Sequence, residues 1–225
     1  ETSNMKLVII DYGSGNLKSV ENAFIYCVKT NNLKFSIEVT DNLSSISEAD
    51  HIVLPGVGSF PDCKKGLQQI DGLIDFLTNE VINKGKKFLG ICVGMQLMVD
   101  YSSEKKRTSG FGWLNGNFKK IKTSGLDYIG RNYKIPHMGW NNLQIKEKNH
   151  PVLENINENE QFYFVHSYAL YTREINEIIA YTTYNQKIPS IIGKNNFLGV
   201  QFHPEKSGNS GQKFIYNWLN WVPES

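Results

Sequence analysis

The sequence contains the stretch Phe88-Leu89-Gly90-Ile91-Cys92-Val93-Gly94-Met95-Gln96. Its first four residues form a short apolar run, which predicts a buried strand. The run passes directly into a segment that predicts a helix to about residue 101. Small residues on both sides of Cys92 allow the sharp strand-to-helix turn that lifts a nucleophilic side chain above a sheet. The stretch therefore predicts a parallel sheet with a nucleophile at the end of one strand.

Earlier segments extend this pattern toward the start of the chain. Strands are predicted at residues 6–10, 35–39 and 51–54. Between the first two, apolar residues recur at helical spacing at Leu17, Val20, Phe24 and Val28. A longer helix is predicted over residues 66–84. Strands and helices that alternate in this way predict a doubly wound α/β sheet with helices on both faces.

The second half of the chain has a different pattern. From residue 110 to 184, glycines, aromatic residues and short alternating runs predict antiparallel strands, including residues 161–165 and 178–183. A further strand is predicted at 197–202 and a closing helix at 211–221. The expected fold class is α/β, with a mostly parallel sheet and an antiparallel extension. Since no linker or repeat divides the chain, residues 5–225 are expected to form one domain.

The composition excludes several classes of protein. The 225 residues include 24 Lys and Arg against 22 Asp and Glu, and 40% are hydrophobic. This balance excludes intrinsic disorder and a strongly basic nucleic-acid-binding domain. No segment approaches the roughly 20 apolar residues of a membrane span, and the polar start is unlike a signal peptide. We expect a cytoplasmic protein that begins at Met5, with residues 1–4 added during cloning.

Cys92 is the strongest candidate nucleophile among the three cysteines. Its predicted position at a helix N-terminus would stabilise a thiolate. The N–H of Val93 would then face a developing oxyanion. Cys27 lies within a helical pattern and Cys63 within a loop, and a buried structural role is expected for both. Such a role is also the alternative for Cys92.

His203 is the best candidate for a general base among the five histidines. Pro204 favours an extended conformation in the residue before it, so side chains two positions apart project to the same side. Glu205 can then orient the imidazole and stabilise its cation. With Cys92, these residues predict a Cys–His–Glu triad. The alternative is a loop histidine beside a solvated glutamate.

The glycine-rich loops do not predict a nucleotide cofactor. Gly13 and Gly15 suggest a dinucleotide-binding loop, but Lys18 stands where its third glycine is required. There is no Walker A pattern and no zinc-type spacing of His and Cys. We therefore expect no metal and no cofactor.

Together these motifs resemble the class I, triad-type glutamine amidotransferases, and more narrowly the glutaminase subunits of imidazole glycerol phosphate synthases. The resemblance extends from Asp11 to Ser207. The turn at Cys92 and the His203-Pro204-Glu205 sequence are shared across the family. Two motifs are more specific, namely Pro55-Gly56-Val57-Gly58-Ser59-Phe60 and Pro136-His137-Met138-Gly139-Trp140-Asn141.

The resemblance implies a reaction at Cys92. The thiol would attack the side-chain amide carbon of glutamine, His203 would pass the proton to departing ammonia, and water would hydrolyse the thioester to glutamate. Backbone groups near the oxyanion would come from Gly56, Val57 and Val93. The substrate pocket would be formed by Gly58, Gln96, His166, Ser167 and Tyr168. For His166, a hydrogen-bonded position in the core is the alternative.

The resemblance also implies a heterodimer with a cyclase subunit of the (β/α)8-barrel type. That partner would use the ammonia to make imidazole glycerol phosphate and AICAR in histidine biosynthesis. The residues expected at or near the partner surface are Asn16, Pro136, His137, Met138, Trp140 and Lys206. For Trp140, a position in the core is equally compatible with the sequence.

Three other functions fit parts of the pattern. A paralogous glutaminase would supply ammonia to a sugar amidotransferase in surface glycan biosynthesis, because the partner determines the acceptor. A γ-glutamyl peptidase would act without a partner, and the motif at residues 136–140 argues against it. A catalytically inactive binding module would lack a triad residue, yet all three residues are present.

Overall fold

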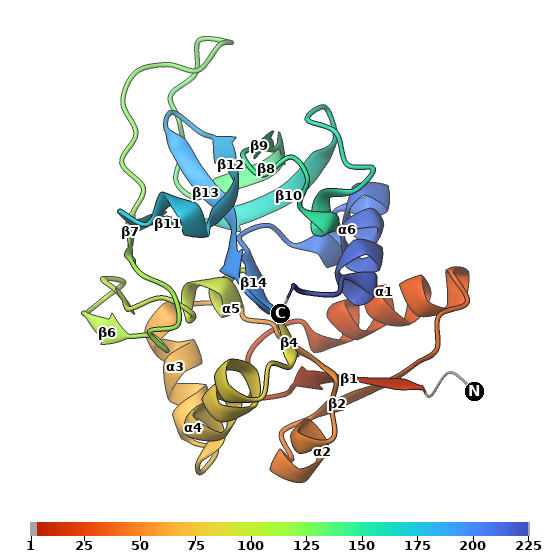
Figure 1. Ribbon diagram of the computed structural model, residues 1–225. Helices are drawn as coiled ribbons and strands as arrows, with labels where there is room; N and C mark the ends of the chain where they lie inside the picture. Colours follow the sequence, from red (N-terminus) through yellow and green to blue (C-terminus); the bar gives the residue numbers. More distant parts are fainter. Residues whose placement is uncertain (1–3, 225) are drawn as a thin grey trace.

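The computed structural model describes residues 4–224, so the prediction for residues 1–4 lies almost wholly outside the described residues. An eight-stranded sheet runs through the centre of the molecule (Figure 1). In spatial order its strands are β2 (Phe35–Thr40), β1 (Met5–Ile10), β3 (His51–Leu54), β4 (Lys87–Ile91), β14 (Phe197–Val200), β13 (Lys187–Lys194), β12 (Ile178–Thr183) and β9 (Gln144–Ile145).

The first five strands in this order are parallel, and the last three continue the sheet in antiparallel pairs. The predicted fold class is therefore confirmed. A continuous core of buried residues extends from Leu7 to Trp221. After their first residues, His51 and Lys87, strands β3 and β4 are apolar and buried on both faces, which is typical of the centre of a parallel sheet.

Two smaller sheets lie beside the main one. One pairs β8 (His137–Asn142) with β10 (Gln161–His166) in antiparallel fashion. The other has the spatial order β11 (Tyr168–Tyr171), β7 (Asn117–Lys120), β5 (Tyr101–Ser102) and β6 (Thr108–Ser109). Strands β10 and β11 follow each other directly, so the turn between them joins the two small sheets.

Helices lie on both sides of the main sheet (Figure 1). Helix α1 (Leu17–Thr30) packs against α6 (Gly208–Asn220), and α3 (Phe60–Gln68) packs against α4 (Leu73–Thr78) and α5 (Val93–Gln96). Helix α2 (Leu43–Ser47) is short. A π-helical turn covers Asn79–Asn83, and 3₁₀ turns cover Pro151–Leu153, Ile175–Glu177 and Pro204–Lys206. In the described residues, no helix has the length and apolar character needed to cross a membrane.

The predicted helix over residues 66–84 is wrong in its bounds. Helix α3 already begins at Phe60, because the Ser59 side chain accepts the N–H of Asp62 at 3.2 Å and so caps the first turn. Gly72, with φ of 72°, then separates α3 from α4. A left-handed backbone at this residue cannot continue a right-handed helix, so the apolar periodicity spans two helices.

The predicted helix from Cys92 to about residue 101 is also wrong. Helix α5 makes a single turn and ends at Gln96. The carbonyls that would extend it are used by a later segment. Phe111 N–H donates to the Leu97 carbonyl at 2.7 Å, and Trp113 N–H donates to the Met98 carbonyl at 2.9 Å. These long-range bonds replace the helical ones.

Candidate active site

Cys92 occupies the tight turn between β4 and α5. Its backbone has φ of 56° and ψ of −111°, a strained conformation for a residue with a side chain. The flanking glycines are required by close packing. A Cβ atom at Gly94 would lie 1.9 Å from the Leu54 carbonyl oxygen, and one at Gly90 would lie 2.5 Å from the Gly94 oxygen. The backbone is thus held against β3, and the turn directs the thiol away from the sheet.

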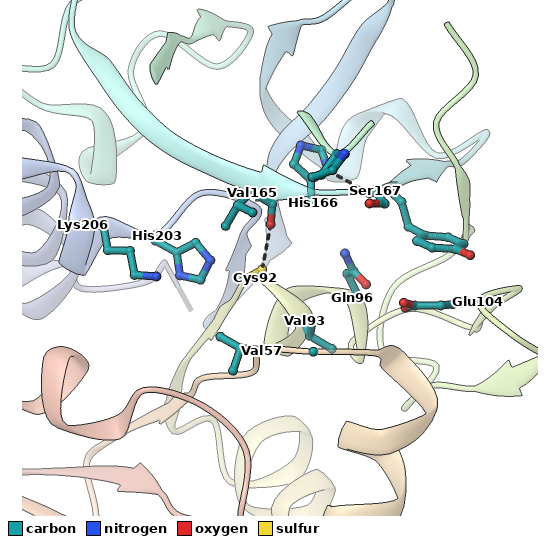
Figure 2. A pocket seen from close by; sticks show the side chains of 13 residues that line it. Val57, Cys92, Val93, Gln96, Glu104, Val165, His166, Ser167, His203 and Lys206 are labelled. Atoms are coloured by element: carbon teal, nitrogen blue, oxygen red, sulfur yellow. Dashed lines mark hydrogen bonds between the residues drawn. The ribbon is translucent and has the colours of Figure 1, made fainter. Parts of the chain in front are cut away.

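A cavity of about 370 Å³ opens above Cys92. Figure 2 shows the thiol at its centre, with Val165 above it, His203 on one side and Gln96 on the other. The Cys92 Sγ atom lies 3.9 Å from the Val165 carbonyl oxygen. The cavity brings together most of the predicted site residues, namely Val57, Gly58, Cys92, Val93, Gln96, His166, Ser167, Tyr168 and His203.

His203 and Glu205 form a buried pair beside the thiol. The His203 Nδ1 atom lies 2.6 Å from Glu205 Oε1, and their side chains are 2% and 3% exposed. Glu205 lies in a 3₁₀ turn, so it reaches the imidazole through that turn and not through the extended geometry used to predict the contact. Burial alone would lower the pKa of His203, but the Cys92 thiol and the Glu205 carboxylate outweigh it and raise the pKa to about 10.

The remaining ring nitrogen of His203 is available for chemistry. Among the described residues, His203 Nε2 has no hydrogen-bond partner although it is buried. Figure 2 shows the imidazole beside Cys92. A buried polar atom without a partner is uncommon, and beside a nucleophilic thiol it is a candidate for proton transfer. The geometry therefore suits proton transfer between the thiol and a bound substrate.

The backbone groups predicted for the oxyanion are engaged elsewhere in this conformation. The Val93 N–H donates to the Gly56 carbonyl at 3.2 Å. The Val57 N–H donates to the Ser14 hydroxyl, also at 3.2 Å, and that hydroxyl lies 3.0 Å from the Val57 carbonyl oxygen. Neither N–H is free to bind an oxyanion. Sequence reasoning did not single out Ser14, because a serine in a turn is common.

The far end of the cavity contains the predicted residue Gln96 and one acidic side chain, Glu104, that the motifs did not identify. Gln96 Nε2 donates to Gln201 Oε1 at 3.3 Å, which fixes the amide of Gln96. Glu104 lines the cavity beyond Gln96 and accepts the N–H of Phe60 at 2.9 Å. Figure 2 shows Gln96 and Glu104 on the side of the thiol opposite His203. Glu104 lies in a segment without a recognisable motif, so no sequence signal pointed to it.

The residues expected at a partner surface fall into three groups. Met138 and Trp140 project from β8 and are 61% and 53% exposed, which rules out a core position for Trp140. Asn16 is also exposed, while Pro136 and Lys206 line the cavity itself. His137 differs, since it is only 3% exposed and makes its contacts inside the molecule.

Known proteins resemble this chain in sequence and in architecture. A family model described as glutamine amidotransferase class-I matches residues 8–221. The chain belongs to the class I glutamine amidotransferase family. Within the described residues, no cluster of three or more His, Cys, Asp or Glu side chains is placed to hold a metal ion.

Curated relatives within this family are similar along their whole length. The imidazole glycerol phosphate synthase subunit HisH of Brucella melitensis is 40% identical over 222 residues, 97% of this chain and 100% of that protein. The HisH subunit of Rhodospirillum rubrum is 39% identical over 219 residues, with the same coverage. The chain therefore groups with the HisH subunits among the amidotransferases.

Solved structures of other amidotransferases share the fold. A structure described as a glutamine amidotransferase superimposes with a TM-score of 0.66, with 94% of this chain and 96% of that chain covered. A putative GMP synthase subunit from Thermoplasma acidophilum gives a TM-score of 0.65, with 97% and 94% covered. Both are 14% identical to this chain, so they support the architecture alone.

Proposed function

We propose that this class I amidotransferase is the glutaminase subunit of an imidazole glycerol phosphate synthase. It hydrolyses glutamine and delivers ammonia to a cyclase partner. The observation that carries the proposal is the position of Cys92, which lies at a strained strand end with the His203–Glu205 pair beside it. The similarity to HisH subunits over the whole chain supports this choice of pathway over a glutaminase that serves sugar amidation.

The reaction follows from the groups around the thiol. His203 Nε2 takes the proton of Cys92 before the attack, which gives the imidazolium that its raised pKa favours. Sγ then attacks the amide carbon of glutamine, and His203 gives that proton to the departing ammonia. Glu205 accepts a hydrogen bond from the protonated Nδ1 and stabilises the imidazolium. In the second half of the reaction, His203 takes a proton from water as it attacks the thioester. Glutamate leaves and the thiol is restored.

The negative charge at the far end of the cavity suits the α-ammonium group of glutamine. Glu104 is the acidic residue among those lining the cavity in the described part of the chain, and it offers a counter-charge to the α-ammonium group. Gln96, held by Gln201, lies between Glu104 and the thiol (Figure 2). This order leaves the side-chain amide of the substrate next to Cys92.

Hydrolysis also requires donors for the oxyanion, and the loop at residues 56–58 controls them. The Gly56 carbonyl occupies the Val93 N–H, and the Val57 N–H faces Ser14. Rotation of the Gly56–Val57 peptide would release the Val93 N–H and turn the Val57 N–H toward the substrate. Because removing one oxyanion donor typically costs 10²–10³ in rate, this rotation separates a slow state from an active one. A partner that drives this rotation would allow fast glutamine hydrolysis only when the partner itself can use the ammonia.

The partner is proposed to be a cyclase of the (β/α)8-barrel type that docks near Asn16, Pro136, Met138, Trp140 and Lys206. Met138 and Trp140 support this surface, because exposed aromatic and Met side chains are enriched in protein interfaces. The compartment would be the cytoplasm, whose reducing conditions suit the free thiols of Cys27, Cys63 and Cys92.

The deciding experiment measures glutamate release from glutamine by the purified chain, alone and with the cyclase and its nucleotide substrate. We expect large stimulation only when both are present, and no activity in Cys92→Ala under any condition. Activity that the cyclase leaves unchanged would retain the triad but reassign the acceptor. Activity in Cys92→Ala would overturn the mechanism.

A further inference from the structure

His137 occupies an unexpected position in the exposed strand β8. Its neighbours Met138 and Trp140 are exposed, whereas its own ring is buried and stacks against Phe164 and Tyr184. The ring centroids lie 5.0 Å and 4.3 Å away. In the β8–β10 ladder, His137 pairs directly with His166. The strand that carries the exposed residues therefore also contacts a residue of the substrate cavity.

The hydrogen bonds of the two histidines fix their tautomers. His166 Nδ1 lies 2.9 Å from the Tyr168 carbonyl oxygen, which can only accept, so this nitrogen carries the proton. The Nε2 atom of neutral His166 then accepts from His137 Nδ1 at 2.8 Å. That leaves His137 Nε2 as an acceptor, and Asn141 Nδ2 lies 3.3 Å from it. In this chain of hydrogen bonds, each donor lies on the Asn141 side and each acceptor on the Tyr168 side.

Both rings are neutral, as this chain of hydrogen bonds requires. Burial is the main cause that lowers the pKa of His137 to about 3 and the pKa of His166 to about 4. The mutual repulsion of two cationic rings acts in the same direction on His137. Two apolar rings would fill this space without burying polar atoms. The hydrogen bonds of the histidines fix the orientation of the rings and of the backbone that they bind, which packing alone would not do.

This chain of hydrogen bonds ends at the Tyr168 carbonyl, which belongs to the backbone that forms the cavity wall. Tyr168 and Ser167 line the cavity, and the Val165 carbonyl lies over the thiol. Figure 2 shows the His166 ring on the side of the strand end away from Cys92. His166 therefore acts on the site through the backbone of residues 165–168 and not by direct contact with the reacting atoms.

We infer that His137 is a positioning residue for glutamine. Through His166 it holds residues 165–168 at the distance from Cys92 that the substrate requires, and it connects this wall to the strand bearing Met138 and Trp140. The inference rests on the proposed function, since it takes the cavity to be the glutamine site.

Two substitutions separate this role from a general effect on folding. His137→Phe keeps a ring between the same neighbours but removes the donor to His166. His137→Asn restores a donor near the position of Nδ1 and gives up the ring. We expect His137→Phe to bind glutamine about tenfold more weakly, as the loss of one buried hydrogen bond predicts, and His137→Asn to recover most of that loss.

Labelling of Cys92 by two reagents provides the test. A glutamine-shaped diazoketone reports the cavity and the thiol together, whereas iodoacetamide reports the thiol alone. We expect His137→Phe to react about tenfold more slowly with the diazoketone at low concentration and at the normal rate with iodoacetamide. In an NMR titration, the pKa of His166 should rise in His137→Phe and return toward the wild-type value in His137→Asn.

The outcomes distinguish this inference from the proposed function. Equal diazoketone rates in wild type and His137→Phe would overturn the role of His137, and so would equal losses with both reagents. Absence of diazoketone labelling in the wild type, with normal iodoacetamide labelling, would instead overturn the glutamine site itself and the inference with it.

Discussion

The imidazole of His203 and the carboxylate of Glu205 meet at 2.6 Å in a buried part of the site, two residues apart in the chain. Glu205 Oε2 has no hydrogen-bond partner in the described part of the chain, so this carboxylate is held chiefly by the histidine. A buried carboxylate is costly unless it is paired. The pair therefore keeps its place because each group stabilises the charge of the other.

Glu205→Gln should uncouple this pair. With the carboxylate gone, the pKa of His203 falls from about 10, and fewer thiolate–imidazolium pairs form at neutral pH. We expect slower alkylation of Cys92 by iodoacetamide at pH 7, and a kcat lower by about 10² or more. Cys27 provides an internal reference for a thiol that should not react at pH 7, because burial raises its pKa to about 11. An alkylation profile identical to wild type from pH 5 to 9 would contradict this role of Glu205.

The strain at Cys92 predicts an unusual order of stabilities. Cys92→Ala and Cys92→Gly should both lack glutaminase activity. Glycine adopts a positive φ without a steric penalty, so Cys92→Gly should have a free energy of unfolding about 1 kcal/mol higher than Cys92→Ala. Urea unfolding of the two variants measures the difference. The reverse order would show that the turn is unstrained.

Ser14 provides a test of the oxyanion loop. Ser14→Ala removes the hydroxyl that binds the Val57 N–H, so the Gly56–Val57 peptide rotates more readily. We expect basal glutaminase activity without the partner to rise about fivefold, the worth of one net hydrogen bond. Stimulated activity should change little. Ser36→Ala, on the exposed side of β2, is the matched control. Unchanged basal activity would assign the restraint to another contact.

The fold was predictable wherever local pattern and tertiary environment agree. Strand β3 occupies the predicted residues, because a short apolar run between turns suits only the buried centre of a sheet. The helix after Cys92 was not predictable in length. The carbonyls just beyond it, those of Leu97 and Met98, accept from Phe111 and Trp113, and no local pattern reveals partners so distant in sequence.

The site shows the same division. Cys92, His203 and Glu205 lie in local motifs whose spacing indicates their chemistry. Glu104 and Ser14 have roles that depend on segments meeting in three dimensions. Glu104 lies in no distinctive pattern, and the glycine-rich loop around Ser14 does not indicate a contact with Val57. The buried position of His137 likewise follows from its partners across the sheet, since the sequence shows only alternation along β8.

His51 should make the fold sensitive to acid. It is fully buried, and burial, with a smaller contribution from Lys87, lowers its pKa from 6.5 to about 4. Between these values the unfolded chain binds a proton that the folded chain does not, so stability falls as the pH drops below 6.5 and is unaffected above it. From pH 7.5 to 5, this group should cost about 2 kcal/mol.

His51→Phe tests this contribution. A phenyl ring keeps the edge contacts with Phe35 and Trp218. Urea unfolding at pH 7.5 and pH 5 should show a smaller loss of stability in the variant than in the wild type. His137 and His166 retain their own acid sensitivity in both proteins, so the comparison isolates one residue. Equal losses in the two proteins would mean that His51 does not titrate in this range.

Trp140→Ala should weaken the complex without harming the site. The indole is 53% exposed and makes an edge contact with Tyr163, so its removal leaves the core intact. As an interface anchor it should be worth about 2 kcal/mol or more, which is roughly a thirtyfold increase in Kd for the cyclase. Calorimetric titration against the cyclase measures this change.

Tyr216 on α6, an aromatic residue that is 41% exposed, provides the control, and Tyr216→Ala should bind the cyclase normally. Alkylation of Cys92 in the isolated chain should be unaffected by either substitution, since neither residue lines the cavity. Normal binding by Trp140→Ala would move the partner surface away from β8, and a slower alkylation rate would show that the indole supports the site directly.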